Sequence, residues 1–168
     1  MSFELEDLPT PLTLMMTFVF CMLMDDITFH HTHKLLHHPW IYPRIHKLHH
    51  EYIQNVAIAA ISTHPVEILL GNSLPMMLGP LLLKNKIHFW TYLMWIYMRL
   101  GETTDGHSGY EFSWSPYRVI PFASSSEYHS FHHTHNVGNY SSFFSFWDSF
   151  YGTNQAYFQF LDEQAKEQ

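Results

Sequence analysis

The sequence predicts an all-α integral membrane protein whose membrane helices carry a histidine-rich metal-binding cap. Three observations support this fold class. Fifteen histidines occur among 168 residues, and many recur at the three- and four-residue spacing of one helix face. Several apolar runs are free of charge, and only 14% of all residues are charged, against about 25% in soluble proteins. Alternating apolar and polar residues, which would indicate strands, form only weak patterns.

The composition suits one domain and excludes several classes of protein. A chain of 168 residues has the length of a single domain, which we take as residues 1–168. The net charge of −7 and the lack of a basic patch with interleaved aromatics argue against nucleic-acid binding. The single cysteine, Cys21, excludes a disulfide scaffold and a cysteine-rich zinc site. Because Cys21 lies in an apolar run, we interpret it as a small buried hydrophobic residue.

Two stretches are predicted to form the membrane helices. Residues 8–24 carry no charge and are bounded by acidic pairs, although they are slightly shorter than the roughly 20 residues of a typical span. Residues 68–98 contain two apolar runs separated by Lys84 and Lys86, which predicts a helical hairpin with the lysines at its turn. Aromatic residues in the second run favour the membrane, because they collect at its interfaces; the alternative is a pair of buried helices in a soluble bundle. These aromatic residues are Trp90, Tyr92, Trp95 and Tyr97.

The polar parts of the chain are expected to form the cap. Residues 25–55 and 101–153 contain the histidine clusters, so we assign both segments to it. Residues 111–126 are predicted to be a loop, because proline and serine recur there. Residues 143–151 are aromatic and nearly uncharged, and either lie on a membrane surface or line a pocket. Residues 162–168 are predicted to be a solvated tail.

Eight histidines fall into three boxes with helical spacing. The first box has two histidines four residues apart, which places both on one helix face, one turn apart. The other two boxes share the spacing i, i+3 and i+4, so each triplet lies within about a 100° arc of a helix. Eight imidazoles exceed the needs of one four- to six-coordinate ion, so the boxes predict two metal ions. The boxes are His33 and His37; His46, His49 and His50; and His129, His132 and His133.

The type of ligand narrows the choice of metal. A shell of nitrogen atoms disfavours Mg²⁺ and Ca²⁺, which prefer oxygen, and suits iron, zinc, copper or nickel. A carboxylate-bridged di-iron bundle would show Glu-x-x-His pairs, whereas these boxes contain no carboxylate. The alternative is a histidine-rich tract that binds metal loosely, and it predicts irregular spacing. Two of the boxes share one pattern, which argues against this alternative.

The remaining histidines and the nearby acidic residues are weaker candidates. His38 follows a box residue and points about 100° away from it on a helix. His64 and His107 stand alone in distinctive contexts, and the residues themselves leave both assignments open. Three acidic residues are candidate acceptors for the second ring proton of a ligand histidine, with ordinary solvated charges as the alternative; they are Asp26, Glu67 and Asp105. The predicted non-ligands are His30, His31, His88 (a polar cap or a snorkelling group at the start of an apolar helix) and His135.

Seven short motifs accompany the boxes: Asp25-Asp26, His-Lys-Leu-His-His-Glu-Tyr at 46–52, His-Pro-Val-Glu at 64–67, Asp-Gly-His-Ser-Gly-Tyr at 105–110, Pro-Phe at 121–122, Gly-Asn-Tyr at 138–140, and Trp-Asp with Gly-Thr at 147–153. Together with the order and spacing of the boxes, they resemble the sterol desaturase and fatty acid hydroxylase superfamily, and most closely its C-4 methylsterol oxidases. The resemblance runs from about residue 8 to residue 153. It implies that His107 is a ligand and that His64 remains a further candidate.

This resemblance implies a multi-pass membrane enzyme of the endoplasmic reticulum with a non-haem centre of two iron ions per chain. Such an oxidoreductase would use O2 to hydroxylate the 4-methyl group of a sterol in sterol biosynthesis, and would oxidise that group further to the carboxylate. Its electrons would come from NAD(P)H through cytochrome b5 and the reductase of cytochrome b5. The lipid membrane would supply the apolar substrate and help to exclude water from the site.

The chain also departs from the family pattern. Lys34 follows the first box residue where arginine is usual, which keeps the charge but loses the bidentate fork of arginine. His30 and His135 stand where tyrosine and phenylalanine are common. Family members usually carry further membrane helices before the first box, so we expect a truncated N-terminal region, with an alternative start or a minimal form of the family as the alternatives. The alternative functions are a sterol C-5 desaturase or fatty acid hydroxylase of the same superfamily, and a catalytically inactive metal-binding remnant.

Overall fold

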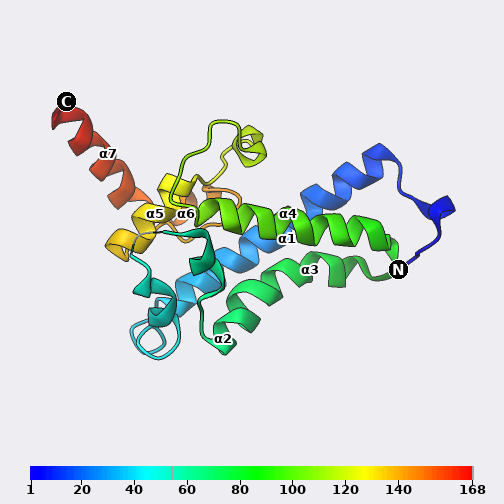
Figure 1. Cartoon of the computed structure of the whole chain (residues 1–168), viewed down its shortest axis with the longest axis horizontal. Coiled ribbons are helices and arrows are strands. Elements are labelled where there is room, and N and C mark those ends of the chain that lie inside the picture. Colours follow the sequence, from blue (N-terminus) through cyan, green and yellow to red (C-terminus); the bar gives the residue numbers. More distant parts are fainter. Residues whose placement is uncertain (54, 168) are drawn as a thin grey trace.

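The computed structural model describes residues 1–53 and 55–167, and in these residues the chain forms helices and no β-strand. The predicted all-α fold class is therefore confirmed. Three long helical segments, α1, α3 and α4, run alongside one another, and most of the short elements gather at one end of them (Figure 1). The C-terminal helix, α7, extends away from that end (Figure 1).

α1 spans Pro11–Leu36 and begins as its sequence predicts. The side chain of Thr10 accepts a hydrogen bond from the backbone N–H of Thr13, and Pro11 occupies the first turn, where its missing N–H is tolerated. At about 1.5 Å per residue the helix measures about 39 Å, which exceeds a hydrocarbon core of about 30 Å. It is one of two helices in the described chain that are long and apolar enough to cross a membrane; the other is Pro65–Lys86.

α1 continues past Asp25 and Asp26, the acidic pair at which the sequence predicts its end. Both carboxylates are buried. Asp25 accepts hydrogen bonds from Nε of Arg99 at 3.0 and 3.1 Å, and Asp26 accepts one from the backbone N–H of Phe144 at 3.0 Å. Because these partners compensate the buried carboxylates, the helix extends into the cap and carries the first histidine box with it.

The second candidate span is built from three consecutive segments: α2 (Pro65–Glu67), the π-helical η4 (Ile68–Ser73) and α3 (Leu74–Leu83). α3 packs along α1. Gly79 permits this close approach, because a Cβ atom there would lie 2.8 Å from the Cα of Cys21. Cys21 is fully buried at this contact, which confirms its interpretation as a small core residue.

A short turn, η5 (Lys84–Lys86), leads into α4 (Phe89–Gly106), so the lysines lie at the turn of a helical hairpin, as the sequence predicts. α4 extends beyond residue 98, the expected end of the hairpin, and reaches the cap. His88 precedes the helix, and its Nδ1 accepts a hydrogen bond from the backbone N–H of Trp90. The predicted role of His88 as a cap is therefore confirmed.

The aromatic residues of α4 divide between the surface and the core. Tyr97 is 81% exposed, in agreement with an interfacial position. Trp95, by contrast, is fully buried, and its indole N–H donates to the carbonyl of Met76 at 2.8 Å. Its assignment as an interfacial residue is therefore wrong, because this face of α4 packs inside the protein. The core residues around it are Cys21, Met22 and Phe143.

The second and third histidine boxes lie on short elements of the cap. The second box lies on a 3-10 helix, η2 (His46–Glu51), and the third on α5 (Ser126–His135). The hydroxyl of Ser125 caps α5 by accepting a hydrogen bond from the backbone N–H of Tyr128. The other short elements are η1 (Leu5–Asp7), η3 (Ala57–Ile61), η6 (Pro116–Val119), α6 (Phe146–Tyr151) and α7 (Gln155–Glu167).

Candidate metal centre

Nine histidines meet in the cap and form two clusters, within each of which the potential ligand nitrogens lie within 4.8 Å of one another. They come from α1, from η2, from the end of α4 and from α5. All are buried except His37, which is half-buried. The first cluster is His33, His37, His46, His50 and His132, and the second cluster is His49, His107, His129 and His133. These are the nine histidines that the sequence and the family resemblance predict as ligands.

Each histidine triplet is divided between the two clusters. On α5, His132 belongs to the first cluster, whereas His129 and His133 belong to the second. η2 is divided in the same way, because His49 belongs to the second cluster and the other two box residues to the first. The imidazole rings of His50 and His133 stack with their centroids 4.6 Å apart, so the two clusters adjoin.

The Nε2 atoms within each cluster are crowded. In the first cluster, Nε2 of His37 lies 3.0 Å from Nε2 of His46 and 3.1 Å from Nε2 of His132. In the second cluster, Nε2 of His107 lies 2.9 Å from Nε2 of His129. Nitrogen atoms bound to one ion at about 2.1 Å and at right angles would lie about 3.0 Å apart. The observed spacing therefore fits imidazole shells around metal ions.

The outer ring nitrogens determine where the lone pairs point. Nδ1 of His33 pairs with the carbonyl of Tyr140 at 3.0 Å, and Nδ1 of His107 pairs with the carbonyl of Thr103 at 2.7 Å. Because a carbonyl only accepts, each Nδ1 carries the proton, and each Nε2 turns a lone pair toward its cluster. The first cluster has two further pairs of this kind: His132 with the carbonyl of Gly138, and His46 with the carboxylate of Glu67.

These converging lone pairs favour a cation between them. His46 and His132 both direct a lone pair at Nε2 of His37, and one neutral imidazole nitrogen has a single proton with which to satisfy two acceptors. A metal ion accepts all of these lone pairs at once, so the residues present fit a metal held by imidazole.

Burial keeps the cluster imidazoles neutral. It lowers the pKa of His37 and of His50 to about 2, of His107 to about 3 and of His49 to about 4, from an ordinary value of 6.5. It also lowers the pKa of His132 well below 6.5, and the neighbouring imidazoles act in the same direction. Neutral imidazole is the form that binds metal, so at neutral pH the clusters need not release protons before an ion can bind.

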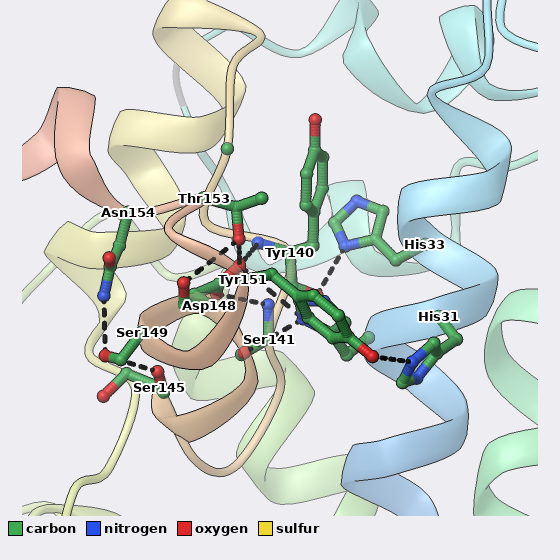
Figure 2. Close-up of polar contacts among 12 residues, drawn as sticks. His31, His33, Tyr140, Ser141, Ser145, Asp148, Ser149, Tyr151, Thr153 and Asn154 are labelled. Carbon is green, nitrogen blue, oxygen red and sulfur yellow. Dashed lines mark hydrogen bonds and ion pairs between the residues drawn. The ribbon is translucent and has the colours of Figure 1, made fainter.

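Asp148 on α6 holds the backbone turn that orients part of the first cluster (Figure 2). Its fully buried carboxylate accepts hydrogen bonds from the backbone N–H groups of Tyr140 and Ser141 at 3.0 and 2.9 Å, and from the hydroxyl of Thr153 at 2.6 Å. The carbonyl of Tyr140 in turn accepts the hydrogen bond from His33. Reasoning from the sequence missed this role, although Asp148 belongs to the Trp-Asp motif of the family resemblance.

Replacing Asp148 with asparagine is expected to weaken metal binding at the first cluster by about 10- to 100-fold. The new NH2 group would face N–H and O–H donors, so the turn that holds His33 would shift. The measurement is a titration of the metal-free protein with Fe²⁺, or with Co²⁺ as a visible probe. Asp105→Asn is the matched control, because the Asp105 carboxylate pairs with Arg118 and not with a cluster histidine. Equal affinities in the two variants would contradict the role given to Asp148.

Several candidates from the sequence lie outside both clusters. Nδ1 of His38 accepts a hydrogen bond from the backbone N–H of Trp40, and Nδ1 of His64 caps α2 by accepting one from the N–H of Val66. Neither histidine is part of a cluster. The four histidines predicted to be non-ligands also lie outside them: His30, His31, His88 and His135.

The three acidic candidates have different partners. Glu67 accepts a hydrogen bond from Nδ1 of His46 at 2.8 Å, as expected for an outer partner of a ligand. Asp26 instead accepts a backbone N–H, and Asp105 forms an ion pair with Arg118 at 2.7 Å. Both of these carboxylates serve to pack the cap, so their predicted pairing with ligand histidines does not occur.

Comparison with known proteins matches residues 18–153 to the model of one family, fatty acid hydroxylase. The chain is 33% identical over 166 residues to methylsterol monooxygenase 1 of Gallus gallus, which covers 99% of this chain and 55% of that protein. It is 38% identical over 165 residues to methylsterol monooxygenase 1-1 of Arabidopsis thaliana, with 95% and 54% covered. It is also 38% identical over 148 residues to methylsterol monooxygenase 1 of Rattus norvegicus, with 87% and 49% covered. The chain thus spans about half the length of these curated relatives, and no solved structure matches it.

Proposed function

This chain belongs to the fatty acid hydroxylase family, and we propose that its nine clustered histidines are the di-iron centre of a methylsterol monooxygenase. The observation that carries the proposal is the pair of adjoining clusters built from imidazole alone. Relatives that are named methylsterol monooxygenases match nearly the whole chain, which supports a methylsterol as the substrate. The proposed reaction is oxidation of a C-4 methyl group of a sterol by O2, within sterol biosynthesis.

In this proposal each cluster holds one iron ion. Bound iron would supply the electrons that cleave O2. Attack on an unactivated C–H bond requires this cleavage. Four of the histidines, His33, His46, His107 and His132, keep their Nε2 lone pairs directed inward, because carbonyls and Glu67 hold the protons on Nδ1. Burial of the clusters limits the access of bulk water, which would otherwise compete with the substrate for the oxidant.

The proposed setting is the endoplasmic-reticulum membrane, with electrons from NAD(P)H through cytochrome b5 and its reductase. The two helices that are long and apolar enough to cross a membrane, Pro11–Leu36 and Pro65–Lys86, support a multi-pass protein. Both lead directly to the clusters, since the first carries His33 and the second begins beside Glu67. An apolar substrate dissolved in the bilayer would therefore meet the centre at the ends of the helices.

Expression in a cell that lacks its own methylsterol oxidase tests the function. We expect accumulated 4,4-dimethylsterols to decrease, and the purified chain to contain close to two iron ions. His49→Ala is the inactive control, because it removes a ligand from the second cluster. A single tightly bound zinc would contradict the proposal. Unchanged sterols in cells whose purified protein contains two iron ions would instead favour another oxidation of the superfamily, such as C-5 desaturation.

A further inference from the structure

A small cavity opens between the two clusters and the start of the second candidate span. Its lining includes ligands of both clusters, among them His46 and His107, together with Thr63 and Glu67. The cavity has room for about one group of the size of a water molecule or a methyl group. We call it the inner cavity.

A larger and mostly apolar groove lies next to the inner cavity, between η4 and α4, and contains about 640 Å³ of space including its open mouth. We call it the flank groove. Its apolar lining is Ile61, Ile68, Met76 and Leu100. The residues that line both the groove and the inner cavity are Ala60, Asn72 and Thr103. The two spaces therefore adjoin at these three residues, with the groove at the side of a candidate membrane helix and the inner cavity at the histidine clusters.

Two side-chain oxygen atoms of residues that line the inner cavity lack partners. Oγ1 of Thr63 and Oε2 of Glu67 are buried and have no hydrogen bond among the described residues. The two residues are only 9% and 4% exposed, respectively. A buried polar group without a partner costs about 1–3 kcal/mol of stability, so the inner cavity favours a ligand that brings a hydroxyl group. Oε1 of Glu67 accepts a hydrogen bond from His46 at the same time. A ligand hydroxyl beside Oε2 would therefore lie next to the first cluster.

A second apolar groove lies between α1 and α6, but the described residues that line it include no cluster histidine. Its lining includes Leu23, Ile27, Phe144 and Trp147. A ligand there would not reach the metal centre, so the flank groove is the better route for a substrate.

We propose that the flank groove and the inner cavity together bind a flat apolar alcohol, with its hydroxyl group inward beside Thr63 and Glu67. The proposal rests on the function given above, under which this alcohol is a 4-methylsterol. The hydroxyl of such a sterol is on C-3, the carbon next to C-4, so the inward end of the molecule carries both the hydroxyl and the methyl group to be oxidised. The ring skeleton and tail then occupy the apolar groove. In this orientation the hydroxyl group fills the inner cavity, and the methyl group lies where the cavity meets the groove, beside Ala60, Asn72 and Thr103.

Thr63 and Glu67 divide the recognition of the hydroxyl between them. The free carboxylate oxygen of Glu67 accepts the hydroxyl proton, and Thr63 donates its own proton to the hydroxyl oxygen. Thr63→Val removes the second contact with almost no change of shape. A site built to pair with a hydroxyl rejects a ligand that lacks it, because its own buried polar groups then stay unpaired.

The experiment compares binding of 4,4-dimethylcholestanol with binding of its 3-deoxy counterpart. The iron-loaded chain is placed in lipid nanodiscs without oxygen, so that binding is measured without turnover. We expect the unmodified chain to bind the alcohol about 5- to 150-fold more tightly, which corresponds to about 1–3 kcal/mol. In Thr63→Val this preference should fall severalfold, through weaker binding of the alcohol alone. Thr104→Val is the matched control, because its exposed hydroxyl donates to the carbonyl of Leu100 and should leave the preference unchanged.

A second pair of variants tests the groove. Leu100→Trp fills the flank groove and should weaken both ligands at least about tenfold, since each would lose its apolar contacts. Leu23→Trp changes a residue of similar exposure in the other groove and should leave both affinities unchanged. Equal binding of alcohol and 3-deoxy ligand, an intact preference in Thr63→Val, or unaltered binding in Leu100→Trp would each overturn the proposal. If the alcohol binds as expected but remains unoxidised with O2 and a reductant, the proposed function fails and the binding site stands.

Discussion

His132→Ala is expected to lose the metal of the first cluster and to retain that of the second, whereas His133→Ala is expected to do the reverse. The two residues are neighbours in the chain, yet their imidazoles belong to different clusters. Each substitution removes one nitrogen from a shell whose other members are imidazoles held in fixed orientations. Oxidation should fall by more than about 100-fold in both variants, because the proposed chemistry needs both ions.

Iron content per chain and the spectroscopic signature of the remaining site provide the measurement. Each variant should keep about half the iron of the unmodified protein, and the two should give different spectra. His135→Ala is the matched control on the same helix, because His135 is exposed and lies outside both clusters. Retention of both ions by His132→Ala, or identical residual spectra in the two variants, would contradict the division of the third box.

Arg99→Leu is expected to destabilise the fold by about 3–5 kcal/mol, the usual cost of removing one partner from a buried ion pair. Arg99 is 3% exposed, and its guanidinium pairs with Asp25 at 3.0 Å and with Glu102 at 2.8 Å. Leucine fills a similar volume but leaves both carboxylates without their cation. Because these residues join α1 to α4, the change should also loosen the base of the cap.

Denaturant unfolding in detergent, followed by tryptophan fluorescence, measures this loss of stability. Arg44→Leu is the matched control, because Arg44 is exposed and donates to the carbonyl of Trp40. That variant should unfold at nearly the same denaturant concentration as the unmodified chain. A loss below about 1 kcal/mol in Arg99→Leu would mean that the two carboxylates are stable without the guanidinium.

Local spacing predicts the helical class and the candidate ligands because both depend on residues close together in the chain. Histidines at i, i+3 and i+4 share a helix face wherever the helix lies, so the boxes are evident before any fold is known. His107 is different, because it stands alone on α4 and was identified through the family resemblance. The end of α1 was misplaced for a related reason: Asp25 and Asp26 resemble a boundary until Arg99 and Phe144 are placed beside them.

Local spacing could not identify the groups that pair with the outer ring nitrogens of the cluster histidines. Asp148 acts through the backbone of Tyr140, and the hydrogen bond from His33 to that carbonyl joins residues 107 positions apart. Backbone carbonyls have no sequence signature, so carboxylates such as Asp26 and Asp105 were more visible candidates, although they pair with the Phe144 N–H and with Arg118 instead of a cluster histidine. Glu67, the third acidic candidate, does pair with a cluster histidine, His46.

The sequence by itself determined that this protein is helical, that it has two long apolar segments, and which histidines have the spacing of metal ligands. Only the tertiary structure decided how those histidines divide, with His132 turned to one cluster and His133 to the other. It also decided that Thr63 and Glu67 line a small cavity that adjoins an apolar groove. The physical reason is that spacing fixes directions around one helix axis, whereas a shared ion or cavity depends on how α1, η2, α4 and α5 cross. Those crossings are set by packing and buried polar contacts between distant residues.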